Sequence, residues 1–165
     1  MVQAMKLGIV GVVFLIVPVV IAKGKSLQHG FDKARYYEVI ASDDVNAINE
    51  ELEILNSSSN TNKAAYEGAL LMKKAGLVKG KERLRLFKAG HVKLEASINK
   101  DTENAELRFL RVIIQEHVPK IVNYRGELQK DTQVIRSSFK GLSPVVQQAI
   151  VDYSKTSKVI RAKEL

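Results

Sequence analysis

Apolar residues recur every three or four positions along most of the chain beyond residue 30, which is the spacing of one face of an α-helix. This pattern predicts helices over residues 31–41, 45–55, 64–75, 81–99 and 102–118. Apolar residues seven apart then continue from Ile121 to Leu142, with either a break or a weak point expected at Gly126. A last helix is expected from Ser143-Pro144, which suits an N-cap followed by proline at the first helical position.

No segment shows the alternation of a half-buried strand or the turn signal of a hairpin. The sequence therefore predicts an all-α fold of six or seven amphipathic helices joined by short turns into antiparallel hairpins. Two architectures fit this pattern, a helical bundle and a short tetratricopeptide-like solenoid. The hairpin over residues 64–99 has roughly the length of one tetratricopeptide unit, about 34 residues. It lacks the consensus residues of that repeat, so the likeness concerns geometry only.

The clearest amphipathic stripe lies in the helix predicted over residues 81–99. Its members are spaced by three or four residues, namely Leu84, Phe87, His91, Leu94 and Ile98. We expect this stripe to face the core. On such a face, His91 is expected to be a hydrogen-bonded core histidine, since a metal site needs three or four ligands.

The first 22 residues have the composition of a targeting segment. Lys6 precedes the uncharged run Leu7–Ala22, and Val20 and Ala22 suit cleavage after Ala22. As a helix this run would span roughly 24 Å, short of the ~30 Å hydrocarbon core. We therefore expect a cleaved signal at residues 1–22 and a single helical domain at residues 23–165, in the periplasm or secreted. The alternative is a membrane anchor formed by residues 7–22.

Charge is unevenly distributed over a chain whose formal net charge is +8. Residues 36–62 contain six acids and no base, whereas residues 73–93 contain eight bases and one acid, Glu82. One interpretation is a binding face for an anionic ligand or membrane surface, with Lys79, Lys81, Arg83, Arg85 and Lys88 as the candidate residues. The other is a solvated helix face, partly neutralised by the acidic helix beside it.

Two further basic residues are candidate ligands on an otherwise apolar helix. Arg108 and Arg111 flank Phe109 and Leu110, and they could form a fork for a carboxylate or phosphate. The alternative is that they pair with Glu106 or other nearby acids while their aliphatic stems cover the helix.

The stretch around these arginines also carries a resemblance. Its residues are Glu106-Leu107-Arg108-Phe109-Leu110-Arg111, then Ile114-Gln115, Pro119, Tyr124 and Asp131. They resemble a pattern in uncharacterised exported helical proteins of Bacteroidetes. The resemblance covers residues 103–160, roughly a third of the chain. It implies an exported helical protein and brings no active site.

Candidate chemistry is sparse in this sequence. The chain has no Cys, which excludes disulfides, thiolate metal sites and a cysteine nucleophile, and it has three His without metal-binding spacing. Phosphate-binding glycine loops and serine nucleophile motifs are absent from the sequence as well. Carboxylates such as Glu50, Glu53 and Asp131 are candidates for acid–base work, but nothing in the sequence places them together. We therefore expect no catalytic residues, no metal and no cofactor.

Three functional hypotheses follow from these features. The first is a non-enzymatic protein of the cell envelope that binds another protein or has a structural accessory role. The second is binding of an anionic ligand, membrane surface or lipid headgroup through residues 73–93. The third is a small envelope hydrolase. A nucleic-acid partner is disfavoured, because Phe87 is the one aromatic residue interleaved with the basic ones and is expected on the core stripe, so it cannot stack on nucleobases. The oligomeric state does not follow from the sequence.

Overall fold

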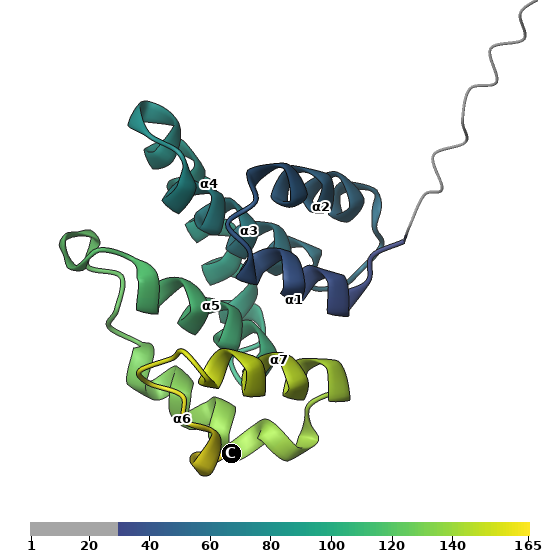
Figure 1. Cartoon of the computed structure of the whole chain (residues 1–165), viewed down its shortest axis with the longest axis vertical. Helices are drawn as coiled ribbons and strands as arrows, with labels where there is room; N and C mark the ends of the chain where they lie inside the picture. Colours follow the sequence, from purple (N-terminus) through teal and green to yellow (C-terminus); the bar gives the residue numbers. More distant parts are fainter. Residues whose placement is uncertain (1–29) are drawn as a thin grey trace, which may run out of the picture.

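Seven α-helices and no strands make up the part of the chain that the computed structural model describes, residues 30–165 (Figure 1). The helices are α1 (Lys33–Ala41), α2 (Val45–Ser57), α3 (Lys63–Leu77), α4 (Gly80–Lys100), α5 (Ala105–His117), α6 (Leu128–Ser138) and α7 (Pro144–Ser154). Three short 3-10 helices lie between or after them, η1 (Lys120–Val122), η2 (Phe139–Gly141) and η3 (Ala162–Glu164). The predicted all-α fold with antiparallel helices is confirmed.

Short polar side chains begin several of these helices, because their oxygens accept hydrogen bonds from the first free backbone N–H groups. Asp32 caps α1, and Asp44 caps α2. The helix α7 begins at Pro144 after Ser143, as predicted, although the side chain of Ser143 accepts no hydrogen bond from the first turn. The helix α5 begins later than expected, because Asn104 caps it by accepting from the backbone N–H of Leu107 at 3.2 Å.

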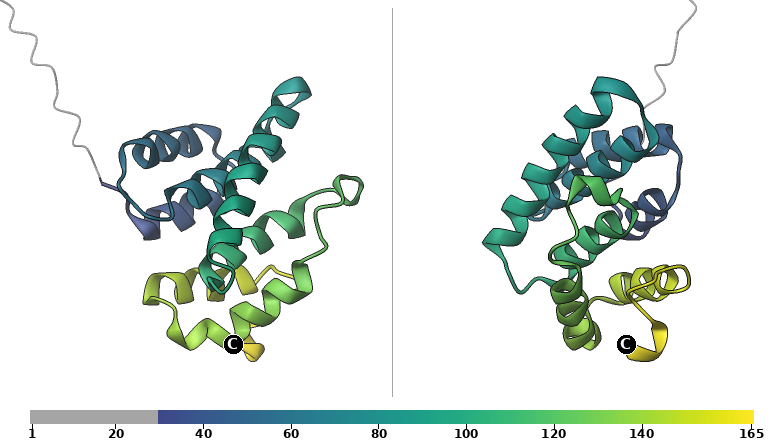
Figure 2. Two further views of the ribbon diagram at one scale, coloured as in Figure 1. Left: turned by 180° about the vertical axis from the view of Figure 1, so that it is seen from behind. Right: turned by 90° about the vertical axis from the view of Figure 1, so that its left-hand side faces the viewer.

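The helix α5 lies at the centre of the domain. Every residue from Ala105 to Gln115 is buried, and the helix contacts α3, α4 and α6. Figure 2 shows α5 between the α3–α4 hairpin and the α6–α7 pair. The first and last α-helices, α1 and α7, also pack against each other. This contact brings distant parts of the chain together, which a solenoid of successive neighbours does not do.

The predicted core stripe of α4 is wrong in its first half. Leu94 and Ile98 are buried, but Phe87 and His91 are only half-buried and Leu84 is 56% exposed. The residues that α4 buries follow a spacing of four, namely Leu86, Gly90, Leu94 and Ile98. The first half of the predicted stripe lies to one side of the buried residues because α4 packs closely on α3 at Gly90, in line with Leu86 and Leu94.

The apolar spacing from Ile121 to Leu142 also does not continue as one buried face. Ile121 lies in η1 and is 94% exposed, whereas Ile135 in α6 is fully buried. Pro119 precedes η1, and the chain has no helical structure between Asn123 and Glu127, around the expected break at Gly126.

The predicted signal at residues 1–22 lies outside the described residues. Within residues 30–165, the helices are too short or too polar to span a bilayer.

Candidate functional site

The basic candidate residues lie on the projecting end of α4. The chain turns into this helix at Gly80, whose φ of +67° is a conformation that favours glycine. The five predicted bases, Lys79, Lys81, Arg83, Arg85 and Lys88, are all exposed. Glu82 lies 3.8 Å from Arg85 in an exposed pair, and the Nε of Arg83 donates to the backbone oxygen of Val78 at 2.9 Å. Solvent-exposed interactions of this kind contribute little free energy.

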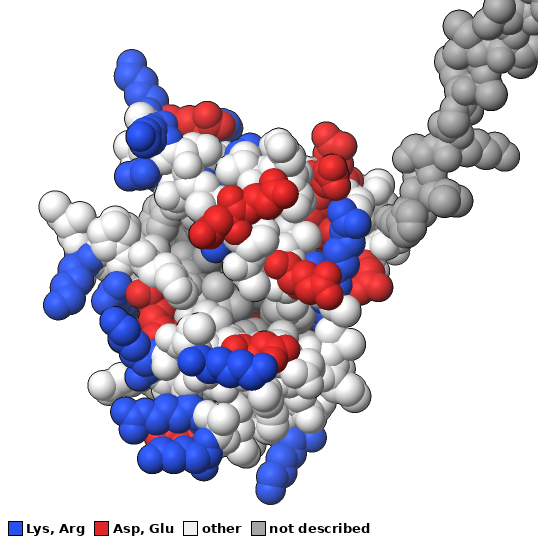
Figure 3. All heavy atoms as spheres, viewed as in Figure 1, with Lys and Arg blue, Asp and Glu red and all other residues white. Residues whose placement is uncertain are grey.

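The acidic segment does not neutralise these bases. Three of its six carboxylates have other partners, since Arg35 pairs with Glu50 and Glu51 at 3.2 Å each and Lys73 pairs with Asp43 at 2.9 Å. Within the described residues, the two charged segments meet through Lys73 and through Lys74, which donates to Asn49 at 2.7 Å, and not through the bases at the end of α4. Figure 3 shows Lys and Arg side chains gathered along the side that holds the end of α4, whereas acidic side chains gather over α1 and α2.

Apolar side chains are exposed beside these bases. Leu84 lies three residues from Lys81 and four from Lys88, so all three share one side of α4. The second group is in η1, where Ile121 and Val122 are exposed next to Lys120. Together the exposed residues on this side of α4 and in η1 form what we call the α4–η1 face, comprising Lys81, Leu84, Arg85, Lys88, Lys120, Ile121 and Val122, while Lys79 and Arg83 lie around the same end of α4.

An aromatic cluster joins the two halves of this face. The ring of Tyr124, two residues after η1, lies 5.8 Å from the ring of Phe87 and 4.8 Å from that of His91. The expectation that His91 is a hydrogen-bonded core histidine is wrong, because its ring is only half-buried against these aromatics and has no hydrogen-bond partner among the described residues. The cluster holds the η1 segment beside α4.

Arg108 and Arg111, the second pair of candidate residues, are buried and already have internal partners. Asp131 of α6 accepts from Nη1 of Arg108 at 2.7 Å and from Nε and Nη2 of Arg111 at 2.7 Å each. Nη1 of Arg111 also donates to Glu95 of α4 at 2.7 Å. The arginine fork therefore binds a carboxylate, but that carboxylate belongs to the same chain.

This network also supports the η1 segment. The Tyr124 hydroxyl donates to the other oxygen of Glu95. Because burial and the neighbouring Glu95 carboxylate disfavour the phenolate, the pKa of Tyr124 is raised well above its usual value. Arg125 donates to the backbone oxygens of Glu116 at 3.0 Å and Val118 at 2.7 Å. The η1 segment is thus held in place by hydrogen bonds to α4, through Tyr124, and to the end of α5, through Arg125.

Two hollows lie elsewhere on the surface, and neither assembles reactive groups. A polar hollow of about 500 Å³ beside the arginine network includes Glu103, Glu127 and Lys130 in its lining. Glu127 lies 3.8 Å from Lys130, so part of its charge is compensated.

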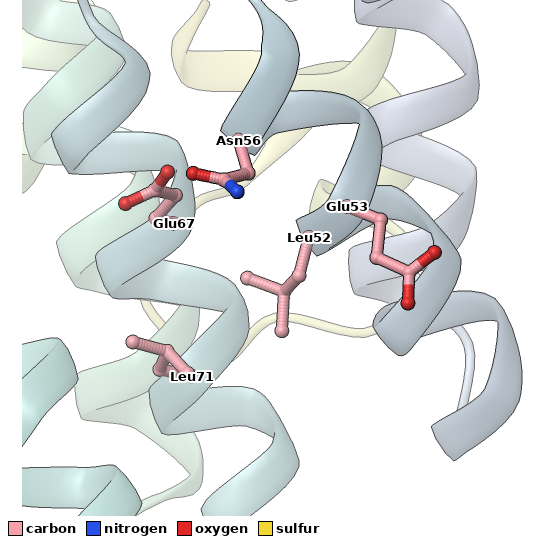
Figure 4. Close-up of a pocket in the computed structure, with 5 residues that line it drawn as sticks. All are labelled: Leu52, Glu53, Asn56, Glu67 and Leu71. Atoms are coloured by element: carbon pink, nitrogen blue, oxygen red, sulfur yellow. The ribbon is translucent and has the colours of Figure 1, made fainter. Parts of the chain in front are cut away.

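The other hollow, of about 310 Å³, lies between α2 and α3 (Figure 4). Leu52 and Leu71 line its apolar side, while the carboxylates of Glu53 and Glu67 point apart. Glu67 pairs with Lys93 at 2.6 Å. Of the other candidate carboxylates, Asp131 is enclosed by arginines and Glu50 pairs with Arg35. Over residues 30–165, His, Asp and Glu form no group that could hold a metal ion.

No family model matches the sequence, and neither curated proteins nor solved structures match it. The resemblance of residues 103–160 to exported helical proteins therefore stays a prediction.

Sequence reasoning found the basic half of the α4–η1 face and missed the η1 half. The sequence pattern places Ile121 in an apolar run with a spacing of seven, although Pro119 and Gly126 enclose it within eight residues. Two residues that disfavour helix interiors so close together indicate a loop, and this signal could have identified the segment.

Proposed function

We propose that this protein is a non-catalytic accessory protein of the cell envelope that binds its partner through the α4–η1 face. The observation that carries the proposal is the exposure of Leu84 and Ile121 beside bases that the acidic helix leaves uncompensated. The envelope location is supported by the apolar run Leu7–Ala22, which is typical of a signal or an anchor.

The exposed apolar side chains support binding because the fold does not use them. Burying one aliphatic side chain of this size contributes about 1.5–3 kcal/mol. Much of that stabilisation is not realised within the domain, because Leu84, Ile121 and Val122 are exposed. Apolar groups held together on a supported surface and rimmed by charge are typical of interaction sites.

Site-specific photocrosslinking in the cells that make the protein tests this function. A photoreactive amino acid replaces Ile121 or Leu84 in the full chain, and Val145 serves as the matched control. Val145 is also an exposed aliphatic residue, but it lies at the start of α7. We expect adducts with an envelope component from positions 84 and 121 and not from position 145.

Two results would contradict the proposal. One is the absence of adducts at both positions of the face, and the other is an equal yield from position 145. Because each probe reports its own surroundings, the outcome does not depend on whether residues 7–22 stay attached to the chain.

A further inference from the structure

We propose that the partner of the α4–η1 face is an anionic lipid surface. Leu84, Ile121 and Val122 enter the boundary between headgroups and acyl chains, while the neighbouring Lys and Arg side chains contact lipid phosphates. This inference rests on the proposed function and names the class of partner for the same face.

The shape of the face supports a lipid surface. Its apolar residues lie on two separate projections, the end of α4 and the η1 segment (Figures 1 and 2). Ile121 is 94% exposed, so it protrudes from the domain and does not line a groove. A bilayer accepts protruding aliphatic side chains at several points, whereas a protein partner needs a pocket shaped for each of them.

The charge of the face also supports a lipid surface as the partner. Five bases at the end of α4 and Lys120 in η1 are accompanied by a single acid, Glu82. Long basic side chains place their charged ends among phosphates while their stems lie along apolar surface. Lipid headgroups diffuse and can match bases at any spacing, so a cluster of one sign without paired geometry suits an anionic bilayer.

The η1 segment is held in place before any contact with lipid. Tyr124 is fixed by Glu95 and the ring of His91, and Arg125 is fixed by the carbonyl groups at the end of α5. Since this segment is already ordered, binding does not carry the entropic cost of ordering a loop.

The α4–η1 face lies apart from the point at which the chain enters the domain. The helix α1 begins on the opposite side of the domain from the end of α4 and from η1 (Figure 1). The sequence predicts a cleaved export signal at residues 1–22, with a membrane anchor at residues 7–22 as the alternative, and either one brings the chain to a membrane. The test therefore needs a probe that reports the face alone.

The absence of Cys from the chain provides such a probe. Ile121→Cys in the full chain is labelled with a fluorophore that shifts to shorter wavelength in an apolar environment, and Val145→Cys on α7 is the matched control. The vesicles are pure phosphatidylcholine, or phosphatidylcholine with about 30% phosphatidylglycerol. We expect a blue shift at position 121 with the anionic vesicles only, its reversal by high salt, and no shift at position 145.

A second set of variants tests the bases. In the labelled Ile121→Cys chain, Lys81→Gln, Arg85→Gln and Lys88→Gln together remove three charges from the face. The control removes three exposed charges elsewhere, through Lys140→Gln, Lys158→Gln and Lys163→Gln. Each base near an anionic surface strengthens partitioning about fivefold, so the face variant should bind about a hundredfold more weakly. The control variant should bind as the parent does.

Three outcomes would overturn the inference. The first is an equal shift with neutral vesicles, and the second is equal weakening by the two triple variants. The third is no shift with any vesicle while photocrosslinks from positions 84 and 121 persist. In that case the proposed function stands and the partner is a protein, whereas loss of the crosslinks as well would contradict both proposals.

Discussion

Buried carboxylates connect different helices of this domain through hydrogen bonds and ion pairs. Glu106 of α5 accepts from Lys33 Nζ at 2.8 Å and from the hydroxyl groups of Tyr37 at 3.0 Å and Tyr66 at 2.6 Å. It thereby joins α5 to α1 and α3. Asp131 joins α6 to α5 through Arg108 and Arg111 in the same way. Charged groups so deeply buried are stable only because each has partners of opposite charge or hydrogen-bond donors.

Replacing Asp131 should therefore be costly. Asp131→Ala leaves two buried guanidinium groups without their shared partner, and we expect a loss of about 3–5 kcal/mol in the free energy of unfolding. Urea unfolding followed by circular dichroism measures this loss. Asp152→Ala is the control, because Asp152 forms only exposed contacts with Lys155 and Gln148 and its loss should change the free energy of unfolding little. A loss below about 1 kcal/mol for Asp131→Ala would mean that water replaces the carboxylate.

The contribution of Glu51 to folding stability changes with pH in the opposite direction to that of an ordinary ion-paired acid. Its side chain is fully buried, and one carboxylate oxygen has no hydrogen-bond partner among the described residues. Burial raises the pKa of Glu51 above the usual 4.5, although the hydrogen bond and charge of Arg35 oppose the shift. The folded protein thus binds this proton more tightly than the unfolded chain does. Its contribution to stability is present below pH 4.5 and is lost as the pH rises through the raised pKa.

Glu51→Gln should remove this dependence. Between pH 4 and pH 7, we expect the stability of the Gln variant to rise relative to that of the unchanged protein. Urea unfolding of both proteins at the two pH values measures the difference. The reverse trend would show that the interaction with Arg35 outweighs the effect of burial.

At the scale of the helices, α3 and α4 approach each other most closely at two glycines. A Cβ added to Gly68 would lie 2.7 Å from the backbone oxygen of Gly90, and one added to Gly90 would overlap the backbone oxygen of Gly68. Both obstacles are backbone atoms, which cannot turn aside as a flexible side chain does. The two helix axes must therefore separate if either residue gains a side chain.

Gly68→Ala and Gly90→Ala should each destabilise the fold by about 1–3 kcal/mol, the usual range for overpacking. Gly76→Ala is a control within α3 itself, since a Cβ there would meet no atom within 4 Å. That variant should gain up to about 1 kcal/mol, because alanine favours a helix over glycine. Thermal unfolding of the three variants measures the contrast. Stabilisation by all three substitutions would contradict the close contact of α3 and α4.

These glycines also explain why the sequence predicted the helices better than their faces. The helix predicted over residues 81–99 spans Gly80–Lys100, but the side of it that packs on α3 is centred on Gly90. Glycine adds nothing to a hydrophobic pattern, so the spacing of Leu84 and Phe87 defined a different stripe. Apolar periodicity locates helices, whereas the choice of face depends on how closely their backbones approach.

The partner of the buried Arg108 and Arg111 side chains could not be predicted from the sequence either. Arg108 and Arg111 are 23 and 20 residues from Asp131, which lies in a different helix. Helical spacing indicates only pairs three or four residues apart. The basic end of α4 was recognised because it is contiguous in sequence, and η1 joins it only through the contacts of Tyr124 in the folded chain.

At the scale of the whole molecule, the tyrosines connect parts of the domain that are distant in sequence. Each hydroxyl donates to a carboxylate or a backbone oxygen of another element, and the five are Tyr36, Tyr37, Tyr66, Tyr124 and Tyr153. Burial is the main reason that the pKa of every one of them is raised above its ordinary value of 10.0. For the four that donate to Glu95, Glu106 or Glu116, the nearby carboxylate raises the pKa further.

The domain should therefore unfold cooperatively in alkali. A group whose pKa is raised by folding stabilises the protein below its unfolded pKa, and that stability is lost as the pH rises above it. Above pH 10.0, each of the five tyrosines should lower the free energy of unfolding by about 1.4 kcal/mol per pH unit. Tyrosinate absorbance and helical circular dichroism should change together in a pH titration, and Tyr153→Phe should make the transition less steep by one proton. Ionisation of most tyrosines while the helices persist would mean that these hydroxyl groups reach solvent in the folded protein.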